Sequence, residues 1–261
     1  MRLEVNGHAA YIASGGRRPD RARETVLFVH GSGQDHSIWT QPTRHFARHR
    51  RCALAVDLPG HGRSAGAPLE RIEDLADWLI ALLDEADRER AAIAGHSLGS
   101  LVALAAAARH PGRVRAIALV GTAWPMAVSP VLLAAAQDDP PQAIDMLTRW
   151  GFHNAGTGAT AAPVNPLREA GRRLLQRARP GVIHTDLKAC HDYAAGLEHA
   201  AAVRCPALLI LGEHDRLTPP RAARQLAAAL PKAETVILEG AGHAMLAEQP
   251  AQVLEQLIRV L

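Results

Sequence analysis

A serine between two glycines, Gly95-x-Ser97-x-Gly99, lies where a short apolar run gives way to an alanine-rich, helix-forming run. A tight turn from a strand into a helix leaves no room for side chains two residues before and two residues after the serine, and glycine meets that need. The pattern therefore predicts that Ser97 stands exposed at the carboxyl end of a strand, where the amide of Leu98 at the helix N-terminus faces any developing negative charge.

Apolar runs alternate with helical patterns over most of the chain. Most of these runs are continuously apolar, which is typical of strands covered on both faces. The first two flank an Asn-Gly pair, a strong hairpin signal. The alternation predicts an α/β fold with a mostly parallel eight-stranded sheet, helices on both faces and ligands at the carboxyl ends of the strands. The predicted strands are 3–5, 9–13, 25–30, 52–56, 90–94, 116–120, 207–211 and 235–238.

The pattern changes after the sixth predicted strand. Helical segments broken by proline and glycine replace the alternation, which predicts an all-helical cap over the active face. We therefore expect a core in two parts, residues 1–121 and 203–261, with a cap formed by residues 122–202. The expected cap helices are 131–137, 142–150, 167–177 and 185–197, with a loop at 154–166 that is rich in Gly, Ala, Thr and Pro.

Several aromatic side chains lie in this insertion, although aromatic residues make up only 3% of the chain. They can pack the cap onto the core, or they can line an apolar pocket. As candidate substrate-binding residues we take Trp124, Trp150, Phe152 and Tyr193.

A serine hydroxyl is a poor nucleophile at neutral pH, so it needs a base within hydrogen-bond reach and an acid that orients the base. His243, framed by glycines just after the last predicted strand, is the predicted base. Asp215 is the predicted acid and is favoured over its rival Glu213, because Asp215 precedes a loop that ends in two prolines. Since Ser97, Asp215 and His243 each follow a parallel strand, we expect them to meet at one edge of the sheet.

Several motifs together resemble the α/β-hydrolase superfamily over nearly the whole chain. This resemblance implies an α/β-hydrolase fold with a helical cap, a second oxyanion-hole amide from Ser32 beside that of Leu98, and no metal or organic cofactor. The motifs that carry it are His30-Gly31-Ser32-Gly33, Asp57-Leu58-Pro59-Gly60-His61-Gly62-Arg63-Ser64, Gly95-His96-Ser97-Leu98-Gly99, Gly212-Glu213-His214-Asp215 and Gly242-His243.

Fold alone does not determine the reaction. A serine nucleophile argues against the family's epoxide hydrolases and haloalkane dehalogenases, which use Asp. Ala244 stands near where carbon-carbon hydrolases usually carry Trp, and His96 and Leu98 differ from the Phe and Met of cofactor-free haloperoxidases. The remaining reaction is hydrolysis of small to medium apolar carboxylic esters through an acyl-enzyme on Ser97. Lactones, thioesters and carbon-carbon substrates stay open, as does a non-catalytic ligand-binding role.

Composition narrows the partners and the compartment. The net charge is +3 with scattered basic residues, which indicates a solvated surface and no nucleic-acid partner. The three cysteines have no metal-ligand spacing and form no disulfide framework, which is typical of a reducing compartment. The sequence has no apolar run of membrane-spanning length and no signal-peptide pattern. We therefore expect a cytoplasmic monomer or homodimer that acts on a small-molecule ester or lactone.

Overall fold

The computed structural model describes residues 1–153 and 165–261, and within them eight strands form one sheet in the order β1-β2-β4-β3-β5-β6-β7-β8. Strands β3 to β8 are parallel, and the β1–β2 hairpin joins the sheet antiparallel to β4. This is the predicted fold class. The strands are β1 Arg2–Val5, β2 His8–Ala13, β3 Thr25–Val29, β4 Cys52–Val56, β5 Ala91–His96, β6 Val114–Val120, β7 Ala207–Gly212 and β8 Ala233–Leu238.

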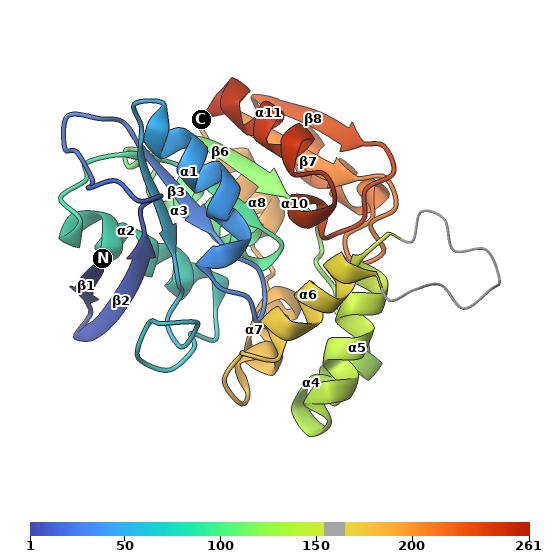
Figure 1. The fold of residues 1–261 in the computed structure, drawn as a ribbon. Helices are drawn as coiled ribbons and strands as arrows, with labels where there is room; N and C mark the ends of the chain where they lie inside the picture. The colour runs from blue at the N-terminus through green and yellow to red at the C-terminus, as the bar shows by residue number, and fades with distance from the viewer. Residues whose placement is uncertain (154–164) are drawn as a thin grey trace.

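Helices cover both faces of the sheet (Figure 1), and a hydrophobic layer lies between the helices and the sheet on each face. The central strands are buried along their whole length, because helices lie on both sides of them. On one face pack α2 Ile72–Glu85, α3 Leu98–Arg109, α8 Gly196–Ala202 and α9 Arg224–Ala229. On the other face pack α1 Thr40–Arg48, α10 Met245–Glu248 and α11 Pro250–Val260.

Four helices follow β6 and gather beside the sheet, where they form the helical cap (Figure 1). They are α4 Pro130–Asp138, α5 Pro140–Gly151, α6 Pro166–Leu175 and α7 Val182–Asp192. Three of them begin with a polar capping residue followed by proline. Proline suits the first helical position because the N–H that it lacks would have no partner within the helix there. The capping side chains of Ser129, Asp139 and Asn165 each accept a hydrogen bond from a first-turn amide.

Some predicted boundaries were wrong. The single helix expected over 185–197 is two helices, because α7 ends at Asp192 and α8 starts at Gly196 after a short extended segment. Two 3-10 turns, His36–Trp39 and Pro220–Ala223, lead into α1 and α9. The short helix α10 was not predicted.

The predicted division into core and cap at residues 122 and 202 stays a prediction. Inside this interval α8 packs against α3 and α9 on the sheet face. Most of the loop predicted at 154–166, residues 154–164, lies outside the described residues. Among the helices that the structure describes, none combines the length and the hydrophobicity that crossing a membrane requires.

Candidate active site

Ser97 occupies the sharp turn between β5 and α3. Its φ of 53° and ψ of −119° are strained for a residue with a side chain, and such strain collects at functional sites. The two glycines make the turn possible: a Cβ on Gly95 would lie 1.9 Å from the carbonyl oxygen of Gly99, and one on Gly99 would lie 2.4 Å from that of Val29. The predicted turn is therefore present, and only glycine fits at both flanking positions.

His243 and Asp215 form a buried pair at the same edge of the sheet. Nδ1 of His243 lies 2.7 Å from Oδ2 of Asp215. Asp215 follows β7 and His243 follows β8, so neighbouring parallel strands deliver the two side chains together. The rival acid, Glu213, is exposed and accepts a hydrogen bond from the amide of Gly240. The acid that contacts His243 is thus Asp215.

Thr218 fixes the orientation of the Asp215 carboxylate. Its hydroxyl donates to Oδ2 of Asp215 at 2.6 Å, and Oδ1 accepts the amides of Leu217 and Thr218 at 2.8 and 2.7 Å. Burial alone would raise the pKa of Asp215, but the positive charge of His243 and these hydrogen bonds outweigh it and lower the pKa. Asp215 is therefore a carboxylate at neutral pH, as an acid that stabilises an imidazolium must be.

The space around the His243 imidazole is closely bounded. Gly121, with φ +61°, lies against the ring, since a Cβ there would be 3.1 Å from both Cε1 and Nδ1. The ring of His96 lies beside it at 4.8 Å between centroids, and His96 Nε2 lies 3.0 Å from the carbonyl oxygen of His243. Burial and the charge of His243 lower the pKa of His96 to about 3. His96 is therefore neutral and packs against the ring of His243.

The predicted oxyanion-hole residues lie next to Ser97. Leu98 opens α3, so its amide belongs to the free N-terminal turn of that helix. The loop after β3 passes directly over the nucleophile, because a Cβ on Gly31 would lie 3.1 Å from Cβ of Ser97. The Ser32 amide follows at once in this loop, and Ser32 lines the same cavity as Ser97 and His243. Both predicted residues thus lie at the site of Ser97, and their role as the oxyanion hole stays a prediction.

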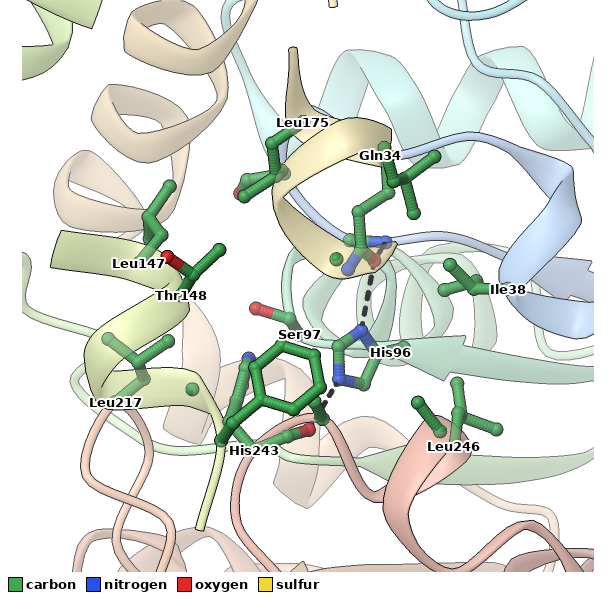
Figure 2. A pocket seen from close by; sticks show the side chains of 18 of the residues that line it. Gln34, Ile38, His96, Ser97, Leu147, Thr148, Leu175, Leu217, His243 and Leu246 are labelled. Atoms are coloured by element: carbon green, nitrogen blue, oxygen red, sulfur yellow. Dashed lines mark hydrogen bonds between the residues drawn. The ribbon is translucent and has the colours of Figure 1, made fainter. Parts of the chain in front are cut away.

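A cavity of about 780 Å³ opens over Ser97 between the sheet edge and the cap. Figure 2 shows Leu147, Thr148 and Leu217 on one side of Ser97 and Ile38 and Leu246 on the other. His243 and His96 lie beside the serine, and Gln34 lies next to His96, with its Oε1 3.2 Å from Nδ1 of His96. Leu175 also lines the cavity. Most of the surface of the wall is apolar, which suits an apolar substrate part.

Of the four aromatic residues predicted to bind substrate, two line this cavity and two do not. Trp150 and Phe152 line it. The prediction for Tyr193 was wrong: the helix break after Asp192 turns this residue into the core, where its hydroxyl lies 2.6 Å from Nδ1 of His199. The prediction for Trp124 was also wrong, because its ring lies against Gly196, where a Cβ would be 1.8 Å from Cδ1 of the indole.

Several residues at the site were missed from the sequence. The aliphatic lining comes from separate elements whose convergence no local pattern reveals. Thr218 carried a usable signal, since a threonine three residues after an acid in a turn often bonds to it.

The described residues contain one group with metal-ligand proximity, formed by Asp35, His36 and Asp57. Asp57 accepts the amide and Nδ1 of His36 on one oxygen and the amide of Arg63 on the other. Its carboxylate is therefore used to hold the loops after β3 and β4.

Comparisons with known proteins agree with this geometry. A family model described as alpha/beta hydrolase fold matches residues 24–250. Pimeloyl-[acyl-carrier protein] methyl ester esterase of Chromobacterium violaceum is 30% identical over 242 residues, 90% of this chain and 91% of its own. The enzyme of the same name from Aromatoleum aromaticum is 31% identical over 258 residues, 91% and 99% of the two chains. Among solved structures, the enol-lactonase of Burkholderia xenovorans LB400 superposes with a TM-score of 0.85 at 25% identity, covering 99% of this chain and 98% of that one.

Proposed function

This chain belongs to the α/β-hydrolase family, and on that premise we propose that it is a serine hydrolase that cleaves carboxylic esters through an acyl-enzyme on Ser97. The observation that carries the proposal is the strained turn at Ser97, which opens into the same cavity as His243, the residue that Asp215 contacts. Relatives named as methyl ester esterases support ester hydrolysis in particular.

Acylation follows from the positions of these groups. His243 Nε2 takes the proton of the Ser97 hydroxyl while Oγ attacks the ester carbonyl carbon. Asp215 bonds the other ring nitrogen, which sets the tautomer and stabilises the imidazolium. The negative charge moves to the carbonyl oxygen, where the amides of Ser32 and Leu98 stabilise it. The tetrahedral intermediate collapses, His243 returns its proton to the alcohol, and the acyl group stays on Ser97.

Deacylation repeats these steps with water. His243 removes a proton from water, hydroxide adds to the acyl carbon, and the same amides hold the oxyanion. Collapse releases the carboxylic acid and restores the Ser97 hydroxyl with the proton from His243. The aliphatic cavity wall holds the acyl chain by burying its apolar surface, which contributes about 0.8 kcal/mol per methylene.

The proposed function is tested by hydrolysis of p-nitrophenyl esters from acetate to laurate with the wild type and with Ser97→Ala. We expect turnover by the wild type that Ser97→Ala loses, with a chain-length optimum that measures the cavity. Turnover that survives in Ser97→Ala would contradict the acyl-enzyme. If the wild type turns over lactones or thioesters but no ester, the triad chemistry stands and the ester assignment fails.

A tryptophan at Leu147 should shorten the range of accepted chains. Leu147 lies on α5 and points into the cavity (Figure 2), so a larger side chain there removes volume from the acyl site. We expect kcat/KM for the longest ester to fall by about tenfold or more, while acetate changes by less than about threefold, since one to two methylenes of lost burial cost that much. Val131→Trp on the exposed face of α4 is the matched control, and an equal loss for all chain lengths would argue against the proposed acyl site.

A further inference from the structure

A carboxylate of the cap reaches the loop that follows β3. Asp186 on α7 accepts the amide of Gly33 at 2.8 Å and lies 2.8 Å from Nε2 of His61, both through Oδ2. The side chains of His61 and Asp186 are only 2% and 1% exposed. Burying an ion pair this completely is costly, and breaking it by removing one partner costs more. This contact joins the cap to the loop that carries Ser32.

His61 carries a positive charge and donates a hydrogen bond to Asp186. Its Nδ1 lies 2.9 Å from the carbonyl oxygen of Pro59 and its Nε2 faces Asp186, so both ring nitrogens meet oxygen acceptors. Only the imidazolium donates from both. Burial alone would lower the pKa of His61, but the charge and hydrogen bond of Asp186 and the Pro59 carbonyl outweigh it and raise the pKa.

The peptide group between Gly31 and Ser32 is held by His30, which lies in the core and not in the cap. The amide of Leu58 donates to Nε2 of His30 at 3.1 Å, so the neutral ring keeps its proton on Nδ1 and donates to the carbonyl oxygen of Gly31 at 2.9 Å. Burial and the charge of His61 lower the pKa of His30 to about 4, which keeps the ring neutral. In a trans peptide the N–H points opposite to the C=O, so this bond also sets the direction of the Ser32 N–H.

Asp186 fixes the next peptide group, since it accepts the Gly33 N–H. The cap also packs tightly on this loop: Gly33 has φ +66°, and a Cβ there would lie 2.7 Å from Cγ1 of Ile183 on α7. The two peptide groups that flank Ser32 are therefore held by His30 from the core and by Asp186 from the cap.

We propose that Asp186, held by His61, is a positioning residue through which the cap sets the Ser32 amide of the oxyanion hole. This inference rests on the proposed function, because it assigns the contact to stabilisation of the oxyanion. Through this pair, the position of the cap affects how well the Ser32 amide stabilises the oxyanion in the transition state. Loss of the Asp186–His61 pair should therefore lower kcat more than it changes KM.

Two variants of similar size separate positioning from packing. In Asp186→Asn, an amide oxygen in the place of Oδ2 can still accept both the Gly33 N–H and the Nε2–H of His61, so this variant removes the charge and keeps the acceptor. Asp186→Leu fills the same space and accepts nothing. We expect kcat for a p-nitrophenyl ester to fall by about 10- to 100-fold in Asp186→Leu and by less than about fivefold in Asp186→Asn, with KM changed by less than about threefold in both.

The control for loss of any cap–core contact is Arg179→Ala. Arg179 donates to the carbonyl oxygen of Ser64 and does not line the cavity among the described residues. We expect its kcat to stay within about twofold, since most contacts away from the site contribute little to the barrier. An equal loss of kcat in Arg179→Ala and Asp186→Leu would overturn the inference.

Wild-type turnover and its dependence on Ser97 are measured alongside. Absence of Ser97-dependent turnover would overturn both the proposed function and this inference. Normal turnover with an Asp186→Leu kcat within about threefold of the wild type would overturn the inference alone. Thermal melting shows whether each variant is folded, and if Asp186→Leu is not, Asp186→Ser, whose hydroxyl is too short to reach Gly33, is judged by the same criteria.

Discussion

Alanine in place of His243 is expected to lower kcat for ester hydrolysis by roughly 10⁴- to 10⁶-fold, because Ser97 then has no base to take its proton. His243 lines the cavity beside Ser97 and is fixed by Asp215, Gly121 and His96, so neighbouring groups hold it in one position. The measurement is steady-state hydrolysis of the best p-nitrophenyl ester from the chain-length series.

The double variant Ser97→Ala/His243→Ala tests whether the two residues act as one unit. Removing a second member of a working triad costs almost nothing further, so the double variant should be as slow as either single variant. The background rate of about 10³-fold over water, which the oxyanion hole and binding supply, should remain in all three. Losses that multiply in the double variant would mean that Ser97 and His243 act independently, which contradicts the triad.

Asparagine in place of Asp215 is expected to lower kcat by roughly 10⁴-fold while the protein folds normally. The asparagine amide cannot stabilise the imidazolium, and its NH₂ facing Nδ1 favours the wrong tautomer of His243. The backbone amides of Leu217 and Thr218 can still donate to the amide oxygen in the place of Oδ1 and hold the side chain, so the loss of kcat comes from the changed charge and tautomer and not from displacement.

Glu213→Gln is the matched control for Asp215→Asn, because Glu213 is the nearby acid that the sequence also offered. Glu213 is exposed, accepts the amide of Gly240 and lies 3.4 Å from Nε2 of His214, whereas the carboxylate that contacts His243 is that of Asp215. We expect kcat within about twofold of the wild type, the usual scale for a surface change. A large loss in Glu213→Gln together with an active Asp215→Asn would reverse the assignment of the acid.

The turn at Ser97 and the placement of His243 and Asp215 were predictable because each depends on short-range signals. Glycines mark where the backbone leaves a strand, and parallel strands put their carboxyl ends on one edge of the sheet. The place of Ser32 was implied by the resemblance to the α/β-hydrolase superfamily.

The cap was harder to predict because its packing depends on contacts between distant residues. His61 and Asp186 are 125 residues apart, and no local pattern pairs them. The prediction for Tyr193 failed because a break of a few residues after α7 changed the direction in which the side chain points. The prediction for Trp124 failed because the sequence does not show that Gly196 leaves space for its indole.

Covalent trapping of Ser97 tests the central claim most directly. The protein is incubated with a serine-directed alkyl phosphonate and analysed by mass spectrometry of the intact chain and its peptides. We expect one adduct per chain, on the peptide that contains Ser97, with loss of esterase activity in proportion to labelling and no adduct in Ser97→Ala. An unlabelled wild type, or an adduct that persists in Ser97→Ala, would contradict the proposal that Ser97 is the nucleophile.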